Sequence, residues 1–206
     1  MKRRLAAATL AACSLLVWTG GRTYGAPAAV SYFIAPAPDE SGARGVRPGD
    51  RQLALWALDA WARAVPGLRF EPADREADAL VRLYWTEAGE GRYGEMQPLM
   101  VGGRRGGAVF IQADVSQLGE GMAMHARQDA LFRDSVVYLT CLHEFGHALG
   151  LAHTSDFGDI MYFFGYGGDI VDYFNRYRTQ LRDRSDIARV SGLSSADIRR
   201  VGSLMK

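Results

Sequence analysis

The spacing of apolar and polar residues divides the chain into short strands and longer helices. Four apolar runs are of strand type, at residues 30–34, 68–70, 77–85 and 108–112. Residues 50–64 place their apolar side chains on one helical face, with Asp50 as the expected N-cap and Pro66-Gly67 as the end. These elements predict a sheet whose strands are interrupted by at least one helix.

The second half of the chain is predominantly helical. Apolar positions recur at helical spacing from about 128 to 149, which predicts one long helix. Further helices are expected near 170–184 and from 193 onward, where Ser194 followed by Asp197 favours an N-cap. Two stretches rich in glycine, 86–107 and 157–168, are expected to be loops. The order of elements predicts an α+β domain.

The N-terminus has the layout of a secretory signal, with a basic start followed by an apolar run from Leu5 to Trp18. That run is short for a membrane span. We assign residues 1–26 to a signal peptide and 30–206 to a single folded domain. Processing has two open routes, because Leu10-Ala11-Ala12-Cys13 is similar to a lipobox, so Cys13 could carry a lipid anchor. Both routes predict an extracytoplasmic protein, either secreted, periplasmic or attached to the cell envelope.

Charge and cysteine content further limit the kinds of partner and crosslink that the protein can have. Of 24 Lys and Arg residues, four precede residue 27, which leaves 20 against 23 acidic residues, a net of −3. Such a balance gives no reason to expect a nucleic-acid partner, and we expect a monomer. Cys141 is the one cysteine of the predicted domain, so no internal disulfide is expected. It lies about 200° around the helix from His143, so we expect a buried thiol facing away from any metal.

Three of the four histidines fall within the stretch HEFGHALGLAH, residues 143–153. On a helix, His143 and His147 share one face and can direct both imidazoles at one zinc ion. Glu144 is offset by one residue, so it is placed to reach a water bound to that ion and remove its proton. A catalytic zinc takes three protein ligands, and His153 can be the third if Gly150 turns the chain out of the helix.

This stretch matches HExxHxxGxxH and thereby resembles the metzincin metalloendopeptidases. Asp159-Ile160-Met161-Tyr162 resembles the Met-turn of that clan, and the Met-Tyr pair is most similar to matrixins. The resemblance implies a small twisted mixed sheet with a long active-site helix, the Met-turn and C-terminal helices. It also implies one catalytic Zn²⁺ held by His143, His147 and His153, with Met161 supporting the site from below and Tyr162 packing beside it or shaping the substrate pocket.

The function implied is a zinc-dependent endopeptidase that hydrolyses peptide bonds through a zinc-bound water activated by Glu144, acting on proteins or peptides. Two alternatives stay open. One is a non-catalytic envelope module with a structural zinc, and the other is a zinc amidase that acts on cell-wall crosslinks. An intact Glu144 argues against the first alternative, because a structural site needs no base beside its metal.

The chain also departs from the family pattern. The second, structural zinc of matrix metalloproteinases cannot be rebuilt, since the remaining histidine, His125, stands alone and is expected in an exposed loop. Calcium has no EF-hand spacing in its favour, and the acids in the loops are expected to be solvated. These acids are Glu87, Glu90, Glu95, Asp156 and Asp159. Nothing resembles a cysteine switch.

Two segments have open roles near the substrate. Residues 162–168, YFFGYGG, are expected either to form the outer pocket wall or to contribute aromatic side chains to the core. Residues 108–111 are either the edge strand that pairs with an extended substrate or an ordinary sheet strand. Some metzincins resemble one another in a tyrosine two residues after the Met-turn methionine. Phe163 occupies that position here, so no tyrosine ligand is expected. The arginines between 176 and 184 are expected on a solvated helix face.

Overall fold

The computed structural model describes residues 29–36, 45–86 and 93–205. The predicted signal peptide, Cys13, Glu87 and Glu90 lie outside these residues. The described strands are β1 (Val30–Ile34), β2 (Phe70–Pro72), β3 (Val81–Thr86), β4 (Gly94–Val101) and β5 (Arg104–Gln112). The described α-helices are α1 (Asp50–Ala64), α2 (Glu120–Gln128), α3 (Ala130–Ala148), α4 (Ile170–Arg178) and α5 (Ser195–Leu204). Within this part of the chain, no helix is both long and apolar enough to cross a membrane.

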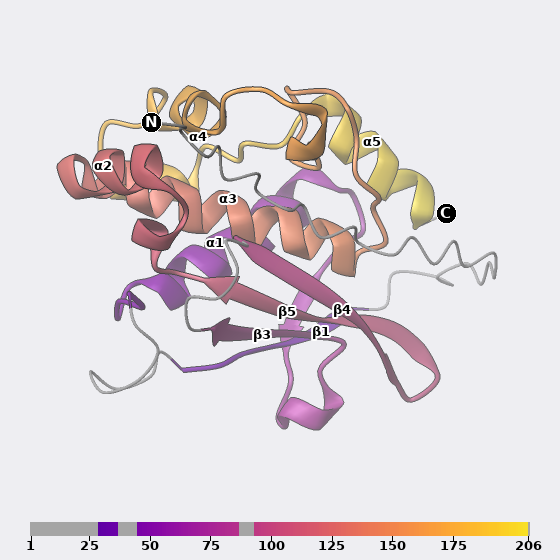
Figure 1. Ribbon diagram of the computed structural model, residues 1–206. Helices are drawn as coiled ribbons and strands as arrows, with labels where there is room; N and C mark the ends of the chain where they lie inside the picture. Colours follow the sequence, from indigo (N-terminus) through magenta and orange to yellow (C-terminus); the bar gives the residue numbers. More distant parts are fainter. Residues whose placement is uncertain (1–28, 37–44, 87–92, 206) are drawn as a thin grey trace, which may run out of the picture.

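The five strands form one mixed sheet in the order β2-β1-β3-β5-β4 (Figure 1). Strands β2, β1, β3 and β5 run parallel, and β4 pairs antiparallel with β5 at the edge. Helices α1 and α3 lie together against this sheet, and α4 lies on the far side of α3. The predicted α+β class is therefore confirmed, and α3 is the central element of the core.

Most of the buried side chains between the helices and the sheet are apolar or aromatic. Trp61 of α1 is fully buried and donates its indole N–H to the carbonyl of Leu142 in α3, at 3.0 Å. Such a buried donor needs a partner, and this bond fixes the two helices relative to each other just before the HExxH segment. Leu83, Val109 and Ile111 cover the sheet side of the same core.

The stretch 86–107 is not the loop that its glycines predicted, because most of it forms β4 and the start of β5. Gly102 and Gly103 have φ of 56° and 77°, the left-handed values that a two-residue hairpin turn requires. Gly106 lies within a strand, where a Cβ would come 2.0 Å from the carbonyl oxygen of Leu80. Glycine is needed at position 106 because the neighbouring strand packs closely there, and it does not mark a loop.

Several boundaries differ from the prediction. The second strand begins at Phe70 rather than 68, and the third is preceded by a 3₁₀ turn at Glu76–Asp78. Helix α3 starts at Ala130, because the Asp129 carboxylate accepts the backbone N–H groups of Leu131 and Phe132, and a separate α2 precedes it. The helix expected over 170–184 ends at Arg178. The N-cap predicted at Ser194 is confirmed, and it forms a capping box, since the side chains of Ser194 and Asp197 each accept the backbone N–H of the other residue.

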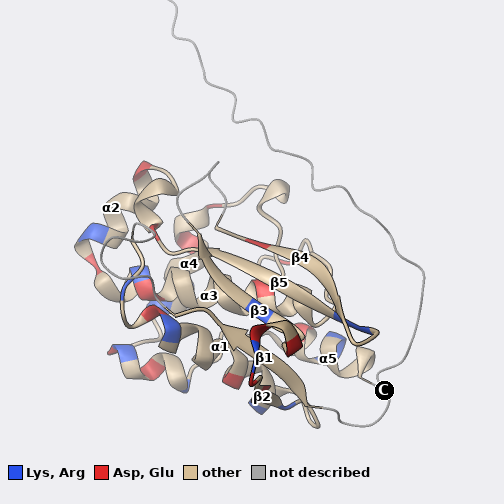
Figure 2. Ribbon diagram, turned by 90° about the horizontal axis from the view of Figure 1, so that it is seen from below, with Lys and Arg blue, Asp and Glu red and all other residues tan. Residues whose placement is uncertain are grey.

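Ion pairs join elements that are distant in sequence, and two predictions were wrong here. Asp50 does not cap α1; Gly49 is at that position, and the Asp50 carboxylate pairs with buried Arg133 of α3. Nor is the arginine group simply solvated, because Arg178 pairs with Asp129 at 2.6 Å and Arg184 with Asp134 at 2.7 Å. Figure 2 shows basic and acidic positions interspersed along the helices, as such pairing requires.

Candidate metal and active site

The C-terminal part of α3 and the turn that follows it bring three histidines together. His143 and His147 lie one turn apart on the helix, and Gly150 ends it with φ of 102°. The N–H groups of Gly150 and Leu151 then bond the carbonyls of His147 and Gly146, both at 2.9 Å, which is a Schellman motif. This turn returns the chain so that His153 Nε2 lies 3.3 Å from His143 Nε2 and 3.1 Å from His147 Nε2.

Two of the three imidazoles are held by backbone carbonyls. His143 Nδ1 lies 2.6 Å from the Ile160 carbonyl oxygen, and His147 Nδ1 lies 2.8 Å from that of Leu151. Because a carbonyl oxygen can only accept, each Nδ1 carries the hydrogen and each Nε2 presents a lone pair. This outer bond is the usual way in which a metal-binding histidine is fixed in tautomer and orientation.

The separations between the Nε2 atoms fit a zinc ion. Two nitrogens bound at about 2.0–2.1 Å in tetrahedral geometry lie about 3.3–3.4 Å apart, close to the 3.3 and 3.1 Å found here. All three donor atoms fall within 4.8 Å of one another. Converging lone pairs at this distance repel each other unless a cation lies between them, so the donor set is suited to a metal.

The imidazoles also have the protonation state that a metal needs. Burial, with the neighbouring His147 and His153, lowers the pKa of His143 to about 3. Burial and His147 lower the pKa of His153 to about 4, and burial lowers the pKa of His147 too. The three rings are therefore neutral at physiological pH and do not have to lose a proton before they bind a cation.

Glu144 lies beside the histidines and next to the edge strand. Its side chain is 6% exposed, and a Cβ at Gly94 of β4 would lie 2.9 Å from Glu144 Oε1. Within the described residues, its carboxylate has no hydrogen bond to protein. Burial, reinforced by the charge of Glu95, raises the pKa of Glu144 to about 8. A cation on the three histidines would favour the carboxylate again and lower this pKa.

The segment 159–161 passes directly beneath α3. Met161 is fully buried, and a Cβ on Gly146 would lie 2.5 Å from the Met161 sulfur, so the methionine occupies space that only a glycine leaves open. The preceding residue, Ile160, accepts a hydrogen bond from His143 and donates its N–H to Asp197 of α5 at 2.9 Å. Helix α5 is thus linked through Ile160 to one of the candidate ligands.

Known proteins are similar to this chain in sequence. A family model described as Matrixin matches residues 29–189. The chain belongs to the matrixin family. Human neutrophil collagenase is 30% identical over 152 residues, which is 71% of this chain and 29% of the relative. Interstitial collagenase of Bos taurus is 33% identical over 100 residues, or 43% of this chain and 21% of the relative.

The relatives are much longer than the shared region, since the chain spans about 29% of neutrophil collagenase. What is shared is the matrixin domain, an α+β metzincin fold whose members bind a catalytic zinc ion and act in general as zinc metalloendopeptidases. The histidine group found in this matrixin is the group of described residues that could hold that ion.

The aromatic segment of this matrixin is divided between core and surface. Tyr162 is buried and donates its hydroxyl to the Gly167 carbonyl at 2.7 Å, and Phe164 packs on Tyr173, with ring centroids 5.0 Å apart. In contrast, Phe163 and Tyr166 are 38% and 65% exposed. The interpretation of residues 162–168 as core is therefore confirmed for Tyr162 and Phe164, and their role as a pocket wall stays a prediction.

Of the two roles left open for residues 108–111, the ordinary sheet strand is confirmed, because β5 is interior to the sheet of described residues and β4 forms its edge beside Glu144. Two further expectations are corrected. His125 is in helix α2, half-buried against Phe132, rather than in an exposed loop. Asp159 is buried rather than solvated, and it accepts from Ser194, Arg200 and Thr154 at 2.6, 2.7 and 3.1 Å. These bonds occupy its oxygens, which leaves no case for calcium at Asp159.

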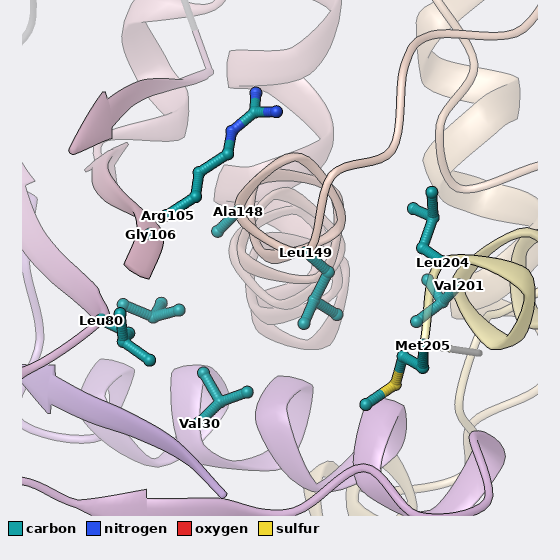
Figure 3. A pocket seen from close by; sticks show the side chains of 10 residues that line it. Val30, Leu80, Arg105, Gly106, Ala148, Leu149, Val201, Leu204 and Met205 are labelled. Atoms are coloured by element: carbon teal, nitrogen blue, oxygen red, sulfur yellow. The ribbon is translucent and has the colours of Figure 1, made fainter. Parts of the chain in front are cut away.

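Cys141 lies in the core as expected, completely buried, and burial raises the pKa of its thiol well above the usual value. A small cavity of about 20 Å³ lies between α3, α5 and the sheet. Figure 3 shows that its lining is mainly aliphatic, including Leu80, Ala148, Leu149, Val201 and Leu204. It contains none of the three histidines, so it belongs to the core and not to the candidate site.

Sequence reasoning misses the residues that hold the site together from a distance. The sequence marks Asp197 only as part of a helix cap, although its Oδ2 also accepts the Ile160 N–H. Gly94 falls within a predicted loop, although it makes room for Glu144. A capping acid and a strand glycine are common, so neither has a sequence pattern that marks such a role.

Proposed function

We propose that this matrixin domain is a zinc-dependent endopeptidase in which His143, His147 and His153 hold the metal and Glu144 is the general base. The observation that carries the proposal is the convergence of three neutral Nε2 atoms beside a carboxylate with no protein partner among the described residues. A structural site would need a fourth protein ligand and would have no use for a free carboxylate.

When bound, zinc supplies Lewis acidity, which lowers the pKa of water and polarises a carbonyl oxygen. Glu144 has two tasks in the reaction. Its carboxylate accepts the proton of the attacking water at one Oε atom, and it later donates that proton to the nitrogen of the leaving amine. Because Glu144 is buried and lies against Gly94 of β4, its carboxylate has few positions to occupy.

The substrate is proposed to be an extended polypeptide lying along β4. This strand is the edge of the sheet, and its first residue, Gly94, touches Glu144. The edge of a sheet offers backbone N–H and C=O groups that pair with an extended chain whatever its side chains are. Such pairing would bring a peptide bond beside the histidines, while the exposed rings of Phe163 and Tyr166 would contact the side chains that follow it.

We further propose that the protein acts outside the cytoplasm, as the basic and apolar pattern of residues 1–26 indicates. Met161 is assigned support of the site from below, Gly150 the turn that returns His153, and Tyr162 a packing role.

An unbiased peptide library, incubated with the protein and with Glu144→Ala carrying equal zinc, tests the proposal. Cleavage by the wild type alone supports an endopeptidase and supplies its side-chain preference. Silence from both would contradict peptide hydrolysis and favour either a cell-wall amidase or a non-catalytic zinc module, which release of amide-linked crosslinks would then distinguish.

A further inference from the structure

The three candidate ligands are not held in the same way. His143 and His147 each donate from Nδ1 to a backbone carbonyl. His153 Nδ1 has no hydrogen bond to any described residue, and His153 is the exposed member of the three. A ligand that follows the end of a helix and lacks this outer bond is free to rotate about its side-chain torsions unless another contact restrains it.

An aromatic ring supplies that contact. Phe163 stacks on His153, with ring centroids 4.9 Å apart and an angle of 24° between the planes. The two residues also belong to chain segments that are tied together by backbone hydrogen bonds. Thr154 N–H bonds the Met161 carbonyl at 2.8 Å, and Phe163 N–H bonds the Thr154 carbonyl at 3.1 Å. The segment that contains Met161 therefore also places the Phe163 ring beside His153.

The structure makes specific room for this ring. A Cβ at Gly165 would lie 2.0 Å from Phe163 Cε1 and 2.6 Å from Cζ, so only glycine at 165 allows the ring to lie where it does. Tyr166 also contacts Phe163, with its ring perpendicular to that of Phe163 and the ring centroids 5.8 Å apart. Phe163 is 38% exposed, so its ring is not part of the fully buried core.

We propose that Phe163 positions the ligand His153, and that the glycine at 165 leaves the space in which the Phe163 ring lies. The inference rests on the proposed zinc site and adds to it a chain-specific restraint. Stacking replaces the Nδ1 hydrogen bond that holds the other two ligands. It limits rotation of the His153 ring and keeps water from one of its faces, so that Nε2 stays directed at the metal.

Zinc retention tests this directly. The purified protein is loaded with zinc and mixed with an excess of a chromophoric chelator, and the rate of zinc loss is followed. Loss of an outer-shell partner typically weakens metal binding about 10–100-fold. Phe163→Ala is therefore expected to release zinc about 10-fold faster than the wild type. Phe163→Tyr, which keeps the ring, is expected to release zinc at nearly the wild-type rate.

Gly165→Ala is the sharper variant, because it retains Phe163 and displaces its ring from His153. It is expected to release zinc as fast as Phe163→Ala. Gly202→Ala is the matched glycine-to-alanine control, since a Cβ added at Gly202 in α5 meets no atom within 4 Å, and it should release zinc at the wild-type rate. The melting temperatures of the metal-free variants should agree with that of the metal-free wild type, and cobalt-substituted samples should differ in their visible spectra.

The outcomes separate this inference from the proposed function. If the wild type retains zinc but Phe163→Ala and Gly165→Ala release it at the wild-type rate, the positioning role is wrong and the zinc site stands. If Phe163→Ala also melts earlier without metal and Gly165→Ala behaves as the wild type, Phe163 only packs, which likewise overturns the proposal. A wild type that binds no zinc would refute the proposed site itself.

Discussion

The candidate site has two halves that are built on different principles. One half is carried by α3 and contains His143, Glu144 and His147 within a single buried helix. The other half is carried by the chain from Gly150 to Tyr166, which contains 3₁₀ and turn structure but no α-helix. The helix fixes its side chains by local geometry, whereas the second half depends on contacts made by residues far away in sequence. This difference decides both what is predictable and what mutation should affect.

Zinc removal should have the largest effect on stability, and the two halves of the site should respond to it differently. A ligand held at 100 to 1,000 times its dissociation constant stabilises a fold by about 3–4 kcal/mol, so chelation should lower the melting temperature by about 10 °C. Amide exchange should increase more around His153 than along α3, because α3 keeps its core contacts. An unchanged melting temperature, or equal changes in both halves, would contradict the comparison.

The next effect concerns Asp159, which ties the second half to α5. Desolvation raises the pKa of the Asp159 carboxyl. The hydrogen bonds from Ser194, Arg200 and Thr154 outweigh this effect, so the net result is a lowered pKa. Asp159→Asn should lower the free energy of unfolding by about 1–3 kcal/mol near pH 7. The loss is kept in this modest range because Arg200 is about one-third exposed and solvent weakens its ion pair.

The pH dependence of that cost has a definite sign. A carboxylate whose pKa is depressed in the folded state contributes fully above its unfolded value of about 3.9 and loses the contribution as pH falls through the folded pKa. The difference in unfolding free energy between wild type and Asp159→Asn should therefore shrink below about pH 4. Chemical denaturation of both proteins at several pH values measures it. A constant difference would mean that the ion pair does not carry the effect.

Gly150 stands at the junction of the halves, and its replacement should have the smallest effect on stability. Its φ of 102° strains any other residue, so Gly150→Ala should cost about 1–2 kcal/mol. Zinc affinity should fall together with stability, because a distorted turn displaces His153. Gly202→Ala is a suitable control, since a Cβ added at Gly202 would have no neighbouring atom within 4 Å. Unaltered zinc affinity in Gly150→Ala would show that the turn does not place His153.

Sequence reasoning predicts the helical half well and the other half incompletely, for a physical reason. Spacing along a helix directly specifies which side chains share a face, so His143 and His147 can be placed together from the letters alone. The stack of Phe163 on His153 and the bond from Ile160 to Asp197 depend on how distant segments pack. No local pattern encodes either contact.

The sheet shows the same limit. Glycines at 102 and 103 favour a turn, but those at 94, 106 and 107 are in strands because other atoms come close to their α-carbons. Composition alone does not distinguish these two causes, so it predicts a loop where β4 lies. Since β4 is the edge strand beside Glu144, this error also hides the strand that we propose to pair with the substrate.

The most direct test of the central claim is the turnover of Glu144→Gln at matched zinc content. The amide keeps the shape of the side chain but accepts no proton, and general-base catalysis typically contributes about 10²–10⁴-fold. We predict that kcat on a cleaved peptide falls by about that factor while zinc stoichiometry stays the same. A variant that keeps both its zinc and most of its turnover would contradict the assignment of Glu144 as the base.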